Sequence, residues 1–185
     1  MSSNTPTELL YVIKIGGNIV DNPVLLTQCL KAFSNIEGKA ILVHGGGKMA
    51  TQLAKDLNIP QQMVEGRRIT DTETLKIVTM VYAGLINKNI VAQLQSFGVQ
   101  AMGITGADAN LIKAHKRVHA SIDYGYVGDV DEVNASMISN LLQQNTSIVI
   151  APITHDGNGQ LLNTNADTIA QSIATAMSAK YAVHL

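Results

Sequence analysis

The sequence contains one cysteine, no tryptophan, two phenylalanines and four prolines in 185 residues. The lone Cys29 excludes an internal disulfide, and its apolar helical surroundings favour a small core residue over a nucleophile. With so few aromatic residues, a hydrophobic core must be built from isoleucine, valine, leucine, alanine and methionine. The composition, 46% hydrophobic and 15% charged, is typical of one folded domain and not of a disordered chain.

Neither charge nor a targeting segment points to a nucleic-acid or membrane partner. The formal net charge is −1, which argues against nucleic acid or an anionic membrane as the main partner. Residues 1–8 are polar and lack the basic and apolar regions of a secretory signal, so we expect a loosely attached start there. Because no apolar run approaches the length that spans a bilayer, we expect a cytoplasmic protein.

The sequence does contain three consecutive glycines between an apolar run and a helical pattern. Residues 41–43 are apolar, Gly45-Gly46-Gly47 follow His44, and apolar residues then recur at positions 49, 50, 53, 54 and 57. Bare backbone amides at a helix N-terminus form a site for a phosphate or a carboxylate. The alternative is a tight strand-to-helix turn without a ligand.

Strands and helices are expected to alternate along the chain. Apolar runs predict strands at 9–15, 40–44, 99–104, 147–152 and 181–185. Helical spacing predicts helices that begin at Pro23, span 49–57, 72–97 and 134–144, and run from Asp167 to about 179. Thr70 or Asp71 is the candidate cap of the long helix, and Gly84 is a candidate break in it. The strand–helix–strand start predicts parallel pairing with a right-handed crossover.

A second group of β-prone residues interrupts this alternation. Residues 112–118 and 124–130 have strand character on either side of turn residues, which predicts a hairpin excursion. His115 and His119 lie in this basic stretch with Arg117, and no third ligand is spaced to join them. We therefore interpret the stretch as a solvated strand face, and we predict no metal site.

Polar or glycine-rich segments follow several of the expected strands, where parallel sheets bind their ligands. Lys14 lies inside an apolar strand just before Gly16 and Gly17, a costly place for a cation unless it meets an anion. The alternative is an edge-strand lysine that faces water. Arg68 precedes a helix start, and its planar guanidinium suits a carboxylate. Asp167 in a first helical turn is, taken alone, an ordinary acid favoured by the helix dipole.

Four segments together resemble the amino acid kinase family. They are VIKIGGN at 12–18, VHGGG at 43–47, GRRIT at 66–70 and NTNAD at 163–167. The match runs from about residue 10 to 185, and the order and spacing resemble the branch that phosphorylates an N-acylated glutamate. The resemblance implies a three-layer α/β/α sandwich with a mainly parallel central sheet, to which this sequence adds the hairpin excursion.

The resemblance also implies roles for individual residues in phosphoryl transfer from ATP, used with Mg²⁺. Lys14 would contact the transferring group, and Asp167 would orient Lys14 and a second lysine. Arg68 and Asn163 would hold the α-carboxylate and the acyl-amide end of an N-acyl-L-glutamate. The phosphate-binding and substrate-binding backbone positions would be Gly16, Gly17, Gly45 and Gly46. The nucleophile is the γ-carboxylate of the substrate, already ionised at pH 7, so no general base is required.

One departure from the family concerns the end of the chain. Family members continue with further strands and helices that hold most of the ATP site, and the second phosphate-binding lysine has no match in this sequence. We expect a single α/β domain over 1–185, with acylglutamate bound by residues 9–180 and a truncated nucleotide-binding part beginning at 181–185. Only about nine polar residues precede the first strand, so arginine control is not expected.

Other functions stay open at this stage. A sibling kinase of the family would act on glutamate, aspartate, carbamate or UMP, and a binding module would hold acylglutamate without turnover. A dinucleotide-binding Rossmann domain is disfavoured because G-x-G-x-x-G is absent. The helix expected at 72–97 is apolar on more than one face, and together with the family resemblance it predicts a homodimer through this helix. The acyl group, acetyl or succinyl, is not fixed by any residue.

Overall fold

The computed structural model describes residues 8–64 and 67–185, and its centre is a five-stranded parallel sheet. The expectation for residues 1–7 lies outside the described residues. The strands follow the order β11, β1, β2, β8 and β5 across the sheet. Their bounds are Ala182–His184, Leu9–Ile15, Lys39–His44, Ser147–Ala151 and Ala101–Thr105, in that order. All five expected strands are therefore confirmed, and they form one sheet.

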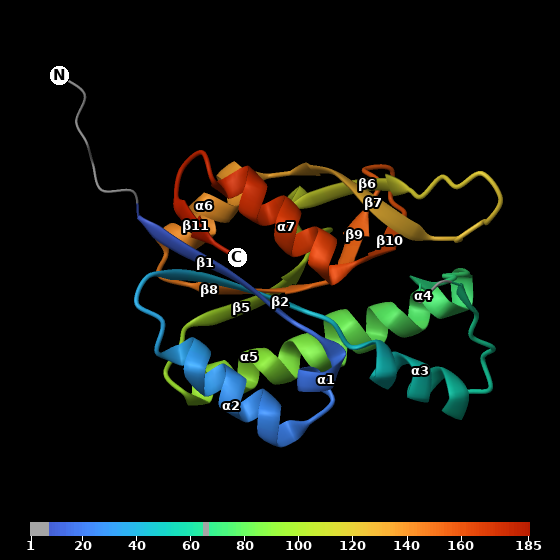
Figure 1. Cartoon of the computed structure of the whole chain (residues 1–185), viewed down its shortest axis with the longest axis horizontal. Helices are drawn as coiled ribbons and strands as arrows, with labels where there is room; N and C mark the ends of the chain where they lie inside the picture. Colours follow the sequence, from blue (N-terminus) through green and yellow to red (C-terminus); the bar gives the residue numbers. More distant parts are fainter. Residues whose placement is uncertain (1–7, 65–66) are drawn as a thin grey trace.

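Helices cover both faces of this sheet, which confirms the predicted three-layer α/β/α sandwich (Figure 1). One face carries α1 (Gly17–Val20), α2 (Pro23–Ser34), α3 (Gly47–Asp56), α4 (Thr72–Val78) and α5 (Asn87–Ser96). The other face carries α6 (Ala135–Gln143) and α7 (Ala166–Met177). Successive residues of a strand face opposite sides of the sheet. Leu42 therefore packs in the first core, on the side of α1–α5, and Val43 packs in the second core, on the side of α6 and α7.

Side-chain caps fix where two of the helices begin. Asn22 accepts hydrogen bonds from two backbone N–H groups at 3.1 Å, and Pro23 occupies the first helical position of α2. Asp71 accepts from the Thr74 N–H at 2.7 Å and starts α4. Both starts agree with the sequence predictions. The short helix α1 was not predicted, because four residues are too few to show a helical period.

The long helix does not break at Gly84. Helices α4 and α5 are joined by a π-helical segment, η1 (Thr79–Ile86), which contains Gly84 and continues the helix without interruption. A Cβ at Gly84 would meet no atom within 4 Å, so the glycine lies on an open face. The single helix predicted over 72–97 is therefore confirmed, and the candidate break at Gly84 is not, because the π-helical hydrogen bonding continues through the glycine.

The joined stretch Thr72–Ser96 also corrects the expectation about apolar length. Its 25 residues reach a mean hydropathy of 1.2 over the most apolar window, enough by length and composition to cross a membrane. Its buried side chains, Val78, Ile86 and Ile90 among them, belong to the first core of the sandwich. The stretch is thus a helix of the folded core, and core helices of folded domains often have this length and hydropathy.

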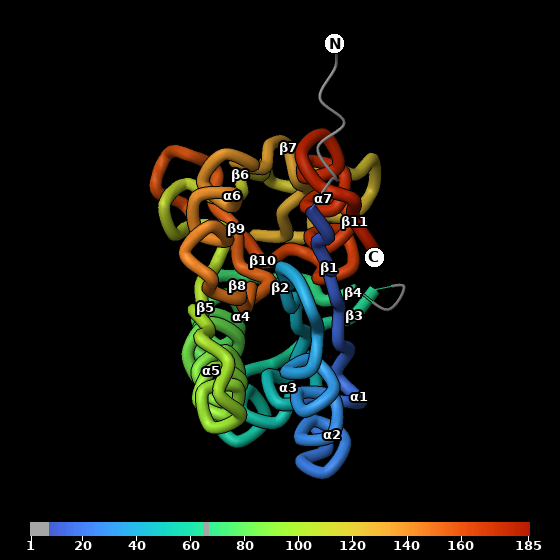
Figure 2. The backbone as a smooth tube through the Cα atoms, turned by 90° about the vertical axis from the view of Figure 1, so that its left-hand side faces the viewer, coloured from blue at the N-terminus to red at the C-terminus, as the bar shows by residue number. Residues whose placement is uncertain are grey.

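The predicted hairpin is confirmed and belongs to a second, smaller sheet. Strands β6 (Ile112–Lys116) and β7 (Val127–Val133) pair antiparallel, and β9 (Ile153–His155) and β10 (Leu161–Thr164) close them into a four-stranded barrel. Figure 2 shows this unit beside the helix layer formed by α6 and α7. The remaining elements are β3 (Met63–Val64), β4 (Arg67–Arg68) and the 3₁₀ turn η2 (Asp108–Asn110). Since β10 leads directly into α7, the barrel positions the start of that helix.

Candidate functional site

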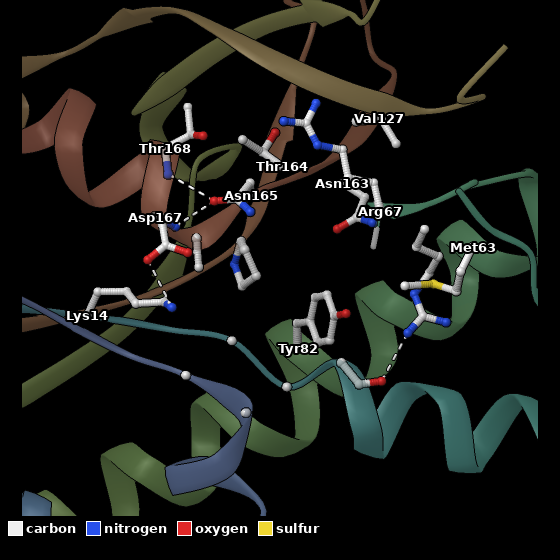
Figure 3. Close-up of a pocket in the computed structure, with 18 of the residues that line it drawn as sticks. Lys14, Met63, Arg67, Tyr82, Val127, Asn163, Thr164, Asn165, Asp167 and Thr168 are labelled. Atoms are coloured by element: carbon white, nitrogen blue, oxygen red, sulfur yellow. Dashed lines mark hydrogen bonds and ion pairs between the residues drawn. The ribbon is translucent and has the colours of Figure 1, made fainter. Parts of the chain in front are cut away.

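All eight residues that the sequence analysis selected line one cavity of about 480 Å³. They are Lys14, Gly16, Gly17, Gly45, Gly46, Arg68, Asn163 and Asp167. The cavity opens at the carboxyl ends of β1 and β2, and its opposite wall comes from β10 and the start of α7 (Figure 3). Gly66, the first residue of the third motif, lies outside the described residues.

Lys14 and Asp167 join the sheet to helix α7. Strand β1 pairs with β11 only as far as Tyr11, so Lys14 lies beyond that pairing. Its Nζ lies 2.9 Å from Asp167 Oδ1, and the two side chains are 28% and 68% exposed. Lys14 thus lies on the open edge of β1, but its ammonium pairs with a carboxylate, and Asp167 contacts this cation as well as complementing the helix dipole. The side chain reaches past Gly16, where a Cβ would lie 3.6 Å from Nζ.

Two glycine turns form the floor of the cavity. Gly46 is the N-cap of α3 with φ of 155°, and a Cβ there would lie 2.1 Å from Ile86 Cδ1, so only glycine fits. The Gly45 N–H donates to the Ile15 carbonyl at 3.0 Å and extends the β1–β2 ladder. This contact corrects the expected role of Gly45, because its amide is already used. The N–H groups at the start of α3 remain directed beyond the helix.

Arg68 connects β4 to the same helix start. Its guanidinium donates to the Gly47 carbonyl at 3.0 Å, to Thr51 Oγ1 at 2.8 Å and to Gln61 Oε1. These bonds hold the planar group at the cavity wall next to the glycine turn. Such a group is suited to pairing with a carboxylate through its remaining edge.

The NTNAD segment positions the opposite wall. Asn163 donates its backbone N–H to Tyr126 O at 2.8 Å and its side-chain amide to Thr70 Oγ1 at 3.0 Å. Asn165 caps α7 by accepting from the Asp167 and Thr168 N–H groups at 2.8 and 3.1 Å. The cap fixes Asp167 in the first turn of the helix, where it meets Lys14 (Figure 3).

His44, directly before the glycine turn, is completely buried. Burial lowers its pKa from 6.5 to about 4, so the imidazole is neutral near pH 7. Nδ1 lies 2.8 Å from the Gly45 carbonyl oxygen, and Nε2 lies 3.3 Å from Asn87 Nδ2. These contacts give the residue a place behind the cavity floor and not within the cavity.

Sequence reasoning missed other residues of the cavity wall, among them Arg67, Tyr82 and Arg117. Arg117 is not part of a solvated face: its Nε donates to both Asp129 carboxylate oxygens at 3.1 Å, and its side chain is largely buried. This pair lowers the pKa of Asp129 and raises that of Arg117. Tyr82, a single aromatic residue in an aliphatic helix, projects toward the centre of the cavity (Figure 3). That isolated aromatic was the one available signal.

The charge balance of the cavity favours anionic ligands. Within the part of the chain that the structure describes, four cationic side chains and one carboxylate line it. The cations are Lys14, Arg67, Arg68 and Arg117, and the acid is Asp167. With backbone amides at a helix N-terminus added, the site suits two anionic groups brought close together.

Comparison with known proteins agrees with this arrangement. The sequence profile of the amino acid kinase family matches residues 10–185. The acetylglutamate kinase of Cytophaga hutchinsonii is 59% identical over 177 residues, which cover 95% of this chain and 67% of that protein. The acetylglutamate kinase of Parabacteroides distasonis is 56% identical over 178 residues, covering 96% and 70%. This chain thus spans about two thirds of the length of these relatives.

A solved structure supports the same assignment at the level of the fold. The crystal structure of smu.665 from Streptococcus mutans UA159 superposes with a TM-score of 0.79 at 26% identity. The superposition covers 92% of this chain and 69% of the other. Together with the profile match over most of the sequence, these similarities show that the chain belongs to the amino acid kinase family.

Proposed function

We propose that this chain phosphorylates the γ-carboxylate of N-acetyl-L-glutamate with ATP, giving N-acetyl-L-glutamyl 5-phosphate and ADP in arginine biosynthesis. The observation that carries the proposal is the convergence of Lys14, Asp167, the glycine turns, Arg68 and Asn163 on one cationic cavity. Two relatives at 59% and 56% identity, which are named acetylglutamate kinase, support the choice of substrate. ATP is the co-substrate that a kinase of this family requires.

The proposed mechanism needs no general base. The γ-carboxylate is ionised at pH 7, so catalysis consists of aligning two anions and neutralising the charge that develops between them. Lys14, held in place by Asp167, neutralises the transferring phosphoryl group, and the N–H groups of Gly17 and Gly46 donate to its oxygens. Arg68 and Asn163 hold the α-carboxylate and the acyl amide. Each of these assignments is part of the proposal.

Mg²⁺ fits this site as a companion of the nucleotide. No three His, Cys, Asp or Glu side chains gather into a metal site within residues 8–64 and 67–185. Magnesium is commonly bound through one or two carboxylates and completes its shell with phosphate oxygens and water. When bound, it would neutralise part of the phosphate charge. The donor set here therefore suits a metal carried by ATP.

The proposal also covers the domain organisation, the cellular compartment and the oligomeric state. We assign acylglutamate binding to residues 9–180 of a single α/β domain and treat 181–185 as the start of the nucleotide-binding part. We place the reaction in the cytoplasm. A homodimer through the long helix is supported by Met80 and Leu85, which are 53% and 50% exposed on that helix.

A hydroxylamine-trapping assay tests the proposal, because an acyl phosphate reacts with hydroxylamine to give a hydroxamate that forms a coloured complex with iron(III). The chain is incubated with MgATP and N-acetyl-L-glutamate, and with L-glutamate, L-aspartate or carbamate in parallel. UMP is followed separately by ADP release, because it yields no acyl phosphate. We expect N-acetyl-L-glutamate to give product at a higher rate than any other acceptor. Turnover of another acceptor in preference would favour a sibling kinase, and binding of N-acetyl-L-glutamate without turnover would favour a binding module.

A further inference from the structure

A buried polar network lies directly behind the glycine turn. His44 and Asn87 are both almost completely buried. His44 Nδ1 lies 2.8 Å from the Gly45 carbonyl oxygen and Nε2 lies 3.3 Å from Asn87 Nδ2. Asn87 Nδ2 also donates to the Val149 carbonyl at 3.0 Å, and Asn87 Oδ1 accepts from Lys88 Nζ at 3.2 Å. The proposed mechanism uses none of these side chains.

These contacts fix which ring nitrogen carries the proton. The Gly45 carbonyl is only an acceptor, so His44 Nδ1 must donate to it. Asn87 Nδ2 is only a donor, so His44 Nε2 must accept. The ring is therefore the neutral Nδ1–H tautomer, and its complete burial is consistent with that charge state.

The same contact fixes the plane of the Gly45–Gly46 peptide. In a trans peptide the C=O and the following N–H point in opposite directions, so the Gly46 N–H points away from His44. His44 pairs with Ile15 in the register, and both side chains lie on the helix α5 face of the sheet. Lys14 lies one residue earlier on β1 and therefore faces the α7 side, where it meets Asp167. The Gly46 N–H is thus directed away from the α5 face.

Gly103 provides space for this network, and the π-helical segment leads directly into Asn87. A Cβ at Gly103 would lie 2.0 Å from Asn87 Oδ1, so the Asn87 amide fits against the neighbouring strand because residue 103 is a glycine. Asn87 is the first residue of α5 after η1, and Ile86 just before it packs against Gly46. The segment therefore supports both the imidazole and the glycine turn.

We propose that His44 is a positioning residue, held by Asn87, that orients the Gly45–Gly46 peptide so that the Gly46 N–H binds the anionic group of the ligand. This inference rests on the proposed function, which puts the γ-carboxylate and the phosphoryl group at the glycine turns. The Gly46 N–H donates to no carbonyl within residues 8–64 and 67–185, so it is available for that bond. His44 acts on the peptide and does not touch the substrate.

Two substitutions of His44 test the contributions of the two ring nitrogens separately. In His44→Asn the side-chain amide reaches the position of Nδ1 and can donate to the Gly45 carbonyl. In His44→Gln it reaches the position of Nε2 and can contact only Asn87. Gln fills more of the buried volume than Asn, so a purely structural role predicts that Gln is the milder change. The positioning role predicts the opposite order.

The readout is the Gly46 amide signal in ¹⁵N-labelled protein titrated with N-acetyl-L-glutamate. We expect the wild type and His44→Asn to show the same shift of this signal with similar Kd values. We expect His44→Gln to lose the shift and to bind at least about tenfold more weakly, as for a lost bond to a charged group. Equal binding by both variants, or weaker binding by His44→Asn, would overturn the inference.

A second measurement keeps this test separate from the proposed function. If the wild type fails to bind N-acetyl-L-glutamate, the proposed function fails, and inorganic phosphate then serves as the probe of the Gly46 amide. Ligand-free ¹⁵N spectra of the imidazole test the network directly. An Nδ1–H tautomer is expected, and it is expected to persist down to about pH 5. A protonated Nε2 at neutral pH would overturn the inference even if both variants were poorly folded.

Discussion

Lys14 Nζ lies 2.9 Å from Asp167 Oδ1, and this contact joins the end of β1 to the first turn of α7 across 153 residues of sequence. Lys14 is only partly exposed, and its ammonium is held by the Asp167 carboxylate in the wall of a cationic cavity. The pair keeps the lysine extended past Gly16, where a Cβ would lie 3.6 Å from Nζ. A positioned lysine of this kind is available to a phosphoryl group without reorganisation.

Replacing Lys14 by Ala is expected to lower kcat by on the order of 10²-fold, comparable to losing one transition-state donor. The change is measured with MgATP and N-acetyl-L-glutamate in the hydroxamate assay. Lys76→Ala is the matched control, because that lysine pairs with Glu73 on the exposed side of α4. A near-normal kcat in Lys14→Ala would remove Lys14 from the site.

Replacing Arg68 by Lys is expected to raise the KM for N-acetyl-L-glutamate much more than the KM for ATP. Lysine keeps the charge but loses the planar group that bonds Gly47 O and Thr51 Oγ1 and faces the cavity. Lys76→Arg is the control, since Lys76 pairs with Glu73 on the exposed side of α4 and does not line the cavity. Equal increases in both constants would indicate that Arg68 only supports the start of α3.

Replacing Gly46 by Ala is expected to destabilise the fold by about 2 kcal/mol or more, because the new Cβ would meet Ile86 Cδ1 at 2.1 Å and φ is 155°. Gly84→Ala in the same helical layer is expected to be neutral or stabilising by up to about 1 kcal/mol, since nothing lies within 4 Å. Urea unfolding of both variants measures the difference. Equal stabilities would mean that the two glycines have the same role.

The sequence predicted the parts of this fold that depend on local pattern. These parts are the strands at 9–15 and 40–44, the helix start at Pro23, the Asp71 cap and the hairpin, which all depend on residues near one another in sequence. Glycines and isolated cations at strand ends indicated part of the candidate site, and the family resemblance supplied the roles of Asn163 and Asp167. These residues are far apart in sequence and line one cavity.

The missed features depend on contacts between distant segments. Arg117 is drawn from the predicted solvated face by Asp129 on the neighbouring strand, a pairing that requires the hairpin register. The amide of Gly45 is taken by Ile15 because β1 and β2 pair in parallel. The π-helical segment forms where Tyr82 and Ile86 pack against Gly46, and no local period in the sequence reports it.

Association through the long helix is expected to give a symmetric dimer that pairs the same patch of each subunit. Met80 and Leu85 leave about half of their surface exposed on this helix. Sedimentation at micromolar concentration is expected to show a dimer for the wild type and a monomer for Met80→Asp combined with Leu85→Asp. The control is Val24→Asp, an exposed apolar position on α2. A clean wild-type monomer would contradict the prediction.

Calorimetric titration of the chain with N-acetyl-L-glutamate measures whether the cavity recognises an acylated glutamate. We expect one binding site per chain, with binding strongly weakened in Asn163→Ala, which removes the amide that donates to Thr70 at 3.0 Å and faces the cavity. We also expect much weaker binding of L-glutamate, which lacks the acyl amide. Absence of binding by N-acetyl-L-glutamate, or equal binding of L-glutamate, would contradict the assignment of this cavity as an acylglutamate site.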